Sequence, residues 1–151
     1  MKSNLQRKQL DEKLEAFSAL QNLNSPVGGW LKAIRTTLGM SLEQLGNKLG
    51  VTKQSIQSLE KREKEGNITI NSLKETAHAL DMKFVYVLLP KDGSLEQLIE
   101  RKAAILAKEI VMRTTQTMAL EDQENAQARL KDAIEERKKE IIESNPKILW
   151  D

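Results

Sequence analysis

Four polar side chains in the middle of the chain carry hydrogen-bonding groups that suit the edges of nucleic-acid bases. They are Lys53, Gln54, Gln57 and Ser58. A glutamine amide presents a donor and an acceptor together, which matches adenine N6 and N7, whereas a lysine donates to guanine O6 and N7. At 100° per residue, a helix with Ile56 and Leu59 facing inward turns these polar side chains outward. The same pattern also fits an ordinary solvated helix face, so its meaning depends on the surrounding elements.

The sequence before these residues predicts two short helices joined by a tight turn. Ser41 and Gln44 form a capping box that begins the first helix, and Gly50 ends it. Thr52 is a good N-cap for the second helix. Gly46 lies inside the first helix, where glycine costs about 1 kcal/mol against alanine, so we expect the backbone of the second helix to approach it closely. This arrangement is a helix-turn-helix.

Positive charge is concentrated on this motif. The whole chain has a net charge of +2, but residues 30–64 hold seven basic and three acidic residues, whereas residues 91–151 hold 11 basic and 13 acidic residues. Helix N-termini and basic side chains are the groups that contact phosphates. The residues that we predict to contact the DNA backbone are Ser41, Lys48, Ser55, Lys61 and Asn67.

The motif from Ser41 to Arg62, with Gly39 before it, resembles the Cro/C1-type (Xre family) DNA-binding domain. The resemblance implies a five-helix domain in which the second helix of the motif reads DNA through the residues after the capping threonine. It also implies an ion pair between Arg35 and Glu60, because such domains carry an arginine and a glutamate at these positions.

Three segments also resemble the narrower "mobile mystery protein A" family. They lie at residues 28–35, 52–61 and 81–90. Members of that family are similar to repressor-antitoxins and are found beside a Fic-domain partner. The resemblance therefore implies a toxin–antitoxin setting.

Length and composition limit the other functions. The chain has 151 residues, 3% aromatic residues, no cysteine and a single histidine, His78. Thiolate and histidine metal sites are therefore not expected, and neither is an enzyme, because the chain also lacks a phosphate-cradling glycine loop. We expect no cofactor. The chain has no apolar run of about 18 residues, so we expect a cytoplasmic protein without membrane contact.

We predict four parts: an N-terminal amphipathic helix and linker (1–26), the DNA-binding domain (27–81), a β-strand (82–90) and a C-terminal helical hairpin (91–151). Leu10, Leu14, Phe17 and Leu20 form the apolar stripe of the N-terminal helix. We expect this helix to pack on the domain, the alternative being a DNA-binding arm. Trp30 is expected in the core of the domain.

Residues 82–89 are rich in strand-forming side chains, and Pro90 ends the run. A single strand needs a partner. Residues 67–70 offer one within the chain, whereas a second protomer offers the identical strand about a two-fold axis. We prefer the homodimer through residues 82–89.

Two helices are predicted after the strand. The first begins with the capping box of Ser94 and Gln97, and the second runs from about Leu120 to Glu143. The apolar stripes are Leu95, Leu98, Ile99, Leu106 and Ile110 in the first helix, and Ala126, Leu130, Ala133, Ile134 and Ile141 in the second. We expect an antiparallel hairpin, and the alternative is that the stripes dock a partner protein.

The expected fold is mainly α: a lambda-repressor-like helix-turn-helix domain with an N-terminal helix, one strand and a two-helix appendage. The leading functional hypothesis is a dimeric, sequence-specific autorepressor that binds a double-stranded DNA operator of an operon encoding a Fic-type partner. The alternative is an antitoxin-like module whose helical appendage inhibits a toxin.

Overall fold

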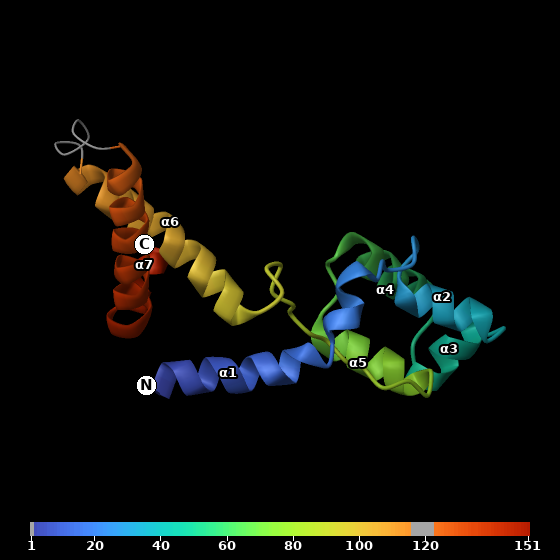
Figure 1. Ribbon diagram of the computed structural model, residues 1–151. Helices are drawn as coiled ribbons and strands as arrows, with labels where there is room; N and C mark the ends of the chain where they lie inside the picture. The colour runs from blue at the N-terminus through green and yellow to red at the C-terminus, as the bar shows by residue number, and fades with distance from the viewer. Residues whose placement is uncertain (1, 116–122) are drawn as a thin grey trace. The chain divides into compact units, whose positions relative to one another are not determined.

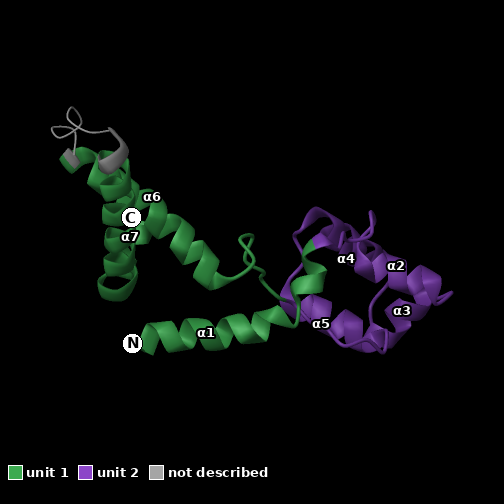
Figure 2. Cartoon of the chain, viewed as in Figure 1, with its two compact units in different colours: residues 1–21, 87–151 green, residues 22–86 purple. Residues whose placement is uncertain are grey.

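The computed structural model describes residues 2–115 and 123–151 (Figure 1). Within these ranges the chain forms seven α-helices and two short 3-10 helices. It divides into two compact units, unit 1 with residues 1–21 and 87–151 and unit 2 with residues 22–86 (Figure 2). Unit 2 is therefore inserted in sequence between the two parts of unit 1.

Four helices form the inserted unit: α2 (Trp30–Thr37), α3 (Leu42–Leu49), α4 (Lys53–Glu65) and α5 (Ile70–Ala79). The helices α2, α3 and α4 each contribute a buried apolar side chain to a common core, and the residue directly after α5 contributes another. The buried core residues are Leu31, Leu45, Ile56 and Leu80. Trp30, which we expected in this core, is 43% exposed. The reason is that Leu31 and Ile34 are the α2 residues that pack in the core.

The ends of these helices are fixed by local sequence. Gly50 ends α3 and Gly66 ends α4, each in the left-handed conformation with φ of 68° and 79°. This backbone conformation is one that side chains disfavour and glycine adopts freely. Thr69 caps α5, with its hydroxyl oxygen accepting from the Ser72 N–H at 3.1 Å. These caps set the lengths of the helices and leave short connections between them.

The prediction of a β-strand over residues 82–90 is wrong, because the structure assigns no strand anywhere in the described ranges. A strand requires a ladder partner. Residues 67–70, the partner available within the chain, are used instead to begin α5, with Thr69 as its N-cap. Val85, Tyr86 and Leu88 consequently stay more than half exposed.

Unit 1 consists of α1 (Lys2–Glu15), the short helix η1 (Ser18–Asn22), α6 (Leu95–Thr115), α7 (Gln123–Ser144) and η2 (Pro146–Trp150). The helices α6 and α7 lie side by side and antiparallel (Figure 1). Ala103 and Ala107 of α6 are fully buried against Ile141 of α7 and Leu149 of η2. The predicted start of the last helix at Leu120 lies outside the described residues.

Polar contacts attach α1 to the start of α6. Arg7 Nε donates to Glu96 Oε2 at 2.5 Å, and the Arg7 side chain is buried. The Asp11 carboxylate accepts from the backbone N–H groups of Leu95 and Glu96 at 2.7 and 3.1 Å, so it caps α6. Within its own unit α1 thus lies against α6, and Leu10 is 48% exposed. The packing of this helix on the DNA-binding domain stays a prediction.

A second ion pair stabilises the turn before α6. Arg101 donates from Nε to Asp92 Oδ1 at 2.7 Å and from Nη2 to Oδ2 at 3.1 Å. This two-point hydrogen bond from Arg101 holds the pKa of the Asp92 carboxyl below its usual value of 3.8.

None of the helices in the described ranges is long and apolar enough to cross a membrane.

Candidate nucleic-acid interface

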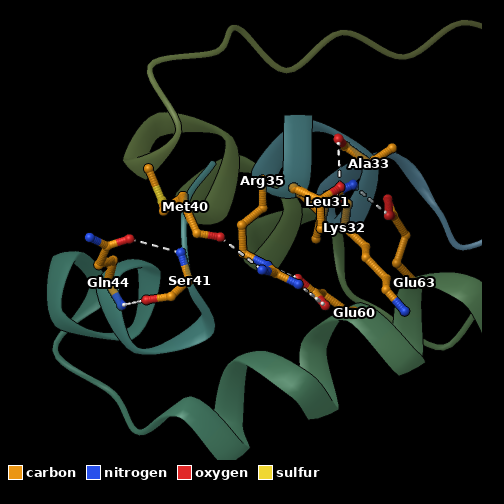
Figure 3. A network of polar contacts seen from close by, with 10 residues as sticks. Leu31, Lys32, Ala33, Arg35, Met40, Ser41, Gln44, Glu60 and Glu63 are labelled. Carbon is orange, nitrogen blue, oxygen red and sulfur yellow. Dashed lines mark hydrogen bonds and ion pairs between the residues drawn. The ribbon is translucent and has the colours of Figure 1, made fainter. Parts of the chain in front are cut away.

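The first helix of the motif, α3, begins with the predicted capping box (Figure 3). Ser41 Oγ accepts from the Gln44 N–H at 3.0 Å, and Gln44 Oε1 accepts from the Ser41 N–H at 2.8 Å. Two backbone donors at the helix start are thus satisfied reciprocally. Ser41 uses its oxygen as an acceptor, so its hydroxyl hydrogen remains free to donate to a phosphate.

Gly46 explains how α3 and α4 come close together. It is buried, and a Cβ atom at this position would lie 2.7 Å from the carbonyl oxygen of Val51. The Gly46 carbonyl also accepts a hydrogen bond from the Val51 N–H at 2.9 Å. A close approach is therefore present, but it is made by the turn directly before α4 and not by the helix that we expected.

The second helix of the motif, α4, is capped by Thr52, whose side chain accepts from the Ser55 N–H at 3.1 Å. Ile56 is fully buried, and Leu59 packs partly against the same core. The four side chains that we predict to read bases are all exposed and lie away from this core. They are Lys53, Gln54, Gln57 and Ser58. They form a continuous polar surface along α4.

The residues predicted to contact phosphates are exposed as well. They are Ser41, Lys48, Ser55, Lys61 and Asn67. Two of them already have neighbours: Ser55 Oγ lies 3.0 Å from Thr52 Oγ1, and Lys61 Nζ lies 3.9 Å from Glu65 Oε1. The Lys61 side chain is 73% exposed, so this contact does not prevent it from meeting a phosphate.

An ion pair joins the reading helix to α2. Arg35 Nε donates to Glu60 Oε1 at 2.5 Å and Arg35 Nη2 donates to Oε2 at 3.2 Å, while Arg35 Nη1 donates to the Met40 carbonyl at 2.9 Å (Figure 3). Both charged side chains are buried. Because a bidentate pair fixes direction as well as distance, it sets the angle of α4 against α2.

A second carboxylate of α4, which sequence reasoning missed, holds the other end of α2. Glu63 Oε1 accepts from the Leu31 N–H at 2.9 Å (Figure 3). Gly29 occupies the N-cap position of α2 and has no side chain to serve as a cap. The signal in the sequence was therefore the Gly28–Gly29 pair before a helix, which leaves an uncapped donor for another element to satisfy.

An open groove runs along one flank of α4. Its volume is about 460 Å³, and it is lined by Val51, Gln54, Ser55, Ser58, Leu59 and Arg62. Two of the predicted base-reading residues, Gln54 and Ser58, belong to it. Val51 and Arg62 were not singled out from the sequence.

Two capped helices joined by a tight turn, with a glycine at their contact and a polar outer face on the second, form a helix-turn-helix. Residues 31–87 match the helix-turn-helix family model. No curated protein and no solved structure matches the chain. The narrower resemblance to the mobile mystery protein A family is not confirmed by these comparisons.

The helix-turn-helix match begins at Leu31 in α2, includes α3 to α5 and ends at Val87. It supports a DNA-binding regulator. Which side chains read bases and which contact phosphates stays a prediction from their positions on α3 and α4. In the described part of the chain no group of three or more histidine, cysteine or carboxylate side chains is arranged to hold a metal ion.

Proposed function

We propose that this protein is a sequence-specific DNA-binding transcriptional regulator that reads bases with α4. The observation that carries the proposal is the match of residues 31–87 to the helix-turn-helix family. The structure adds an exposed polar face on α4, opposite a helix face that is anchored by Ile56 and Glu60. A side chain that reads bases must be exposed while its backbone is held rigidly, and α4 meets both conditions.

In the proposed mechanism α4 lies in the major groove, which is wide enough to admit an α-helix. Gln54 and Gln57 present their amides to adenine edges, and Lys53 donates to guanine. Each good bidentate pair contributes about 1–3 kcal/mol of discrimination against a wrong base. The predicted phosphate contacts position the helix without reading sequence.

The test is fluorescence-polarisation binding of the full chain to DNA from upstream of its own gene and to a scrambled duplex, at two salt concentrations. The Lys53→Ala/Gln54→Ala variant removes two reading side chains. The matched control is Gln127→Ala/Lys131→Ala, which removes the same two residue types from exposed positions of α7. Both variants lose one positive charge, so only the position of the change differs.

We expect tighter binding to the upstream sequence, weaker binding at higher salt, and a loss of discrimination in the Lys53→Ala/Gln54→Ala variant alone. Equal and weak binding of both duplexes by the wild-type chain would overturn the proposal. So would a control variant that loses discrimination to the same extent as the α4 variant.

We further propose that the protein acts as a dimeric autorepressor of an operon that encodes a Fic-type partner. The support is the resemblance of residues 28–35, 52–61 and 81–90 to a family found beside such partners. A dimer predicts a pseudo-palindromic operator with half-sites about 10–10.5 bp apart, or a multiple of that spacing. Footprinting on the upstream DNA tests for the paired half-sites, and sedimentation of the protein tests for the dimer. A single protected half-site bound by a monomer would contradict dimeric repression.

A second candidate function is an antitoxin-like protein-binding module. It is favoured by the separate core of the helical unit and by two exposed apolar side chains of α6, Ile105 and Met112. Binding of a co-expressed Fic-type partner should then survive Lys53→Ala/Gln54→Ala and fail in Ile105→Asp/Met112→Asp. If neither variant affects a complex, or no complex forms, α6 is not a docking surface.

A further inference from the structure

The groove on the flank of α4 combines an apolar wall with part of the reading face. Gln54 and Ser58 line it from the reading face, while Val51 and Leu59 supply carbon surface. The lining is more apolar than polar. A groove of this composition suits a ligand that presents a small apolar group beside hydrogen-bonding groups.

The backbone of Val51 in this wall is held by Gly46. Its N–H donates to the Gly46 carbonyl, and its own carbonyl occupies the space left by the missing side chain of Gly46. The N–H and the carbonyl of Val51 thus both lie against Gly46, while the residue stays 41% exposed. Leu59 is anchored in the core from its other side. An exposed valine on a fixed backbone can provide a shape-specific contact because little freedom remains to be lost on binding.

The charge of the groove limits its occupant. No acidic side chain lines it, and Arg62 adds a positive charge one turn beyond Ser58. A polyanion is therefore favoured over an acidic or neutral peptide. On the major-groove edge of DNA, the methyl group at C5 of thymine is the apolar group that the four bases present.

We propose that Val51 and Leu59 receive the C5-methyl group of a thymine, with Gln54 reading an adjacent base and Arg62 contacting the phosphate backbone beside it. The inference rests on the proposed function, since it assigns part of the sequence preference of a DNA-reading helix. It adds Val51 to the residues that determine specificity and predicts a thymine at a fixed place in each half-site.

The experiment first selects preferred duplexes from a random library with the full-length protein. Each thymine of the selected site is then replaced by deoxyuridine, which lacks only the C5-methyl group, and the dissociation constant is measured for each duplex. The same series is run with Val51→Ala, which shortens the apolar wall, and with Val51→Thr, which keeps its shape. Thermal unfolding of each variant shows whether the fold is retained.

We expect one replacement by deoxyuridine to weaken wild-type binding about fourfold, the effect of one buried methyl group. In Val51→Ala the same replacement should raise the dissociation constant about twofold or less, because the apolar wall that covers the methyl group is smaller. In Val51→Thr the effect of the replacement on the dissociation constant should lie between those in wild type and Val51→Ala. This loss of coupling between one methyl group and one side chain is the result that supports the proposal.

Three results would overturn it. A selected site without thymine, or one in which every deoxyuridine replacement leaves binding unchanged, would contradict the methyl contact. Sequence-specific DNA binding would still stand in that case. A methyl effect that is equal in wild type and Val51→Ala places the contact elsewhere on the protein. If no sequence is enriched at all, the proposed function fails, and this proposal fails with it.

Discussion

Arg35 Nε lies 2.5 Å from Glu60 Oε1, and both side chains are less than a tenth exposed. The residues are 25 positions apart and belong to α2 and α4. The third guanidinium nitrogen of Arg35, Nη1, donates to the Met40 carbonyl, so the guanidinium also holds the chain as it enters α3. One side chain thereby connects α2 to α4 and to the turn before α3, and its partner extends from the helix that we propose reads DNA.

We expect Glu60→Gln to lower the free energy of unfolding by about 3–5 kcal/mol, because it leaves the buried Arg35 charge without its counter-charge. Urea denaturation, monitored by circular dichroism, measures this difference in the free energy of unfolding. The matched control is Glu65→Gln in the same helix, which removes an exposed pair with Lys61 and should cost about 1 kcal/mol or less. Equal stability of Glu60→Gln and wild type would contradict the structural role of the pair.

Gly29→Ala should destabilise the domain by about 1 kcal/mol or more. Gly29 has a φ of 90°, and a Cβ atom there would collide with the Glu63 carboxylate that caps α2. The adjacent Gly28→Ala is the control, because its Cβ would meet only Lys32 Cδ at 3.4 Å. Thermal unfolding should separate the two variants, and similar midpoints for both would show that the Gly29 site tolerates a side chain.

Glu63→Ala removes the acceptor for the Leu31 N–H and should lower the free energy of unfolding by about 0.5–2 kcal/mol, as the loss of a helix cap does. Hydrogen exchange of the Leu31 amide reports the contact directly. Faster exchange at Leu31, with the α5 amides protected as in wild type, is the expected pattern. Unchanged exchange at Leu31 would show that Glu63 does not cap α2 in solution.

Gly46→Ala should destabilise the motif although alanine is the better helix former. The gain in helix propensity is about 1 kcal/mol, whereas the added Cβ would stand 2.7 Å from the Val51 carbonyl and force α3 and the turn apart, which costs about 1–3 kcal/mol. Asn47→Ala, at the next and exposed position of α3, is the control and should be neutral or stabilising. A more stable Gly46→Ala protein would refute the close approach.

The Asp92–Arg101 pair should make the turn before α6 sensitive to acid. The pKa of Asp92 is lowered in the folded chain by the Arg101 hydrogen bond, so the pair stabilises the fold above the ordinary aspartate value of 3.8. That contribution is lost as the pH falls through the lowered folded pKa. An NMR titration of the Asp92 carboxyl should give a midpoint below 3.8 in wild type and a higher one in Arg101→Gln. The same midpoint in both proteins would contradict the assignment.

The features that the sequence determined by itself are those set by neighbours along the chain. The capping box of Ser41 and Gln44, the left-handed Gly50 and the Thr52 cap each depend on groups within four residues. Because local hydrogen bonds and backbone preferences act over that range, the two helices of the motif could be placed and their inner and outer faces assigned.

Tertiary structure decided what depends on groups far apart in sequence. Arg7 is buried because Glu96 lies opposite it, and Asp11 caps a helix that begins 84 residues later. Residues 82–90 carry the composition of a strand, yet strand formation depends on a partner, and the partner segment became the cap of α5. Glu63 caps α2 although it lies 32 residues from Leu31, whose N–H donates to its carboxylate. Such pairings depend on which elements meet in space, a relation that local periodicity does not encode.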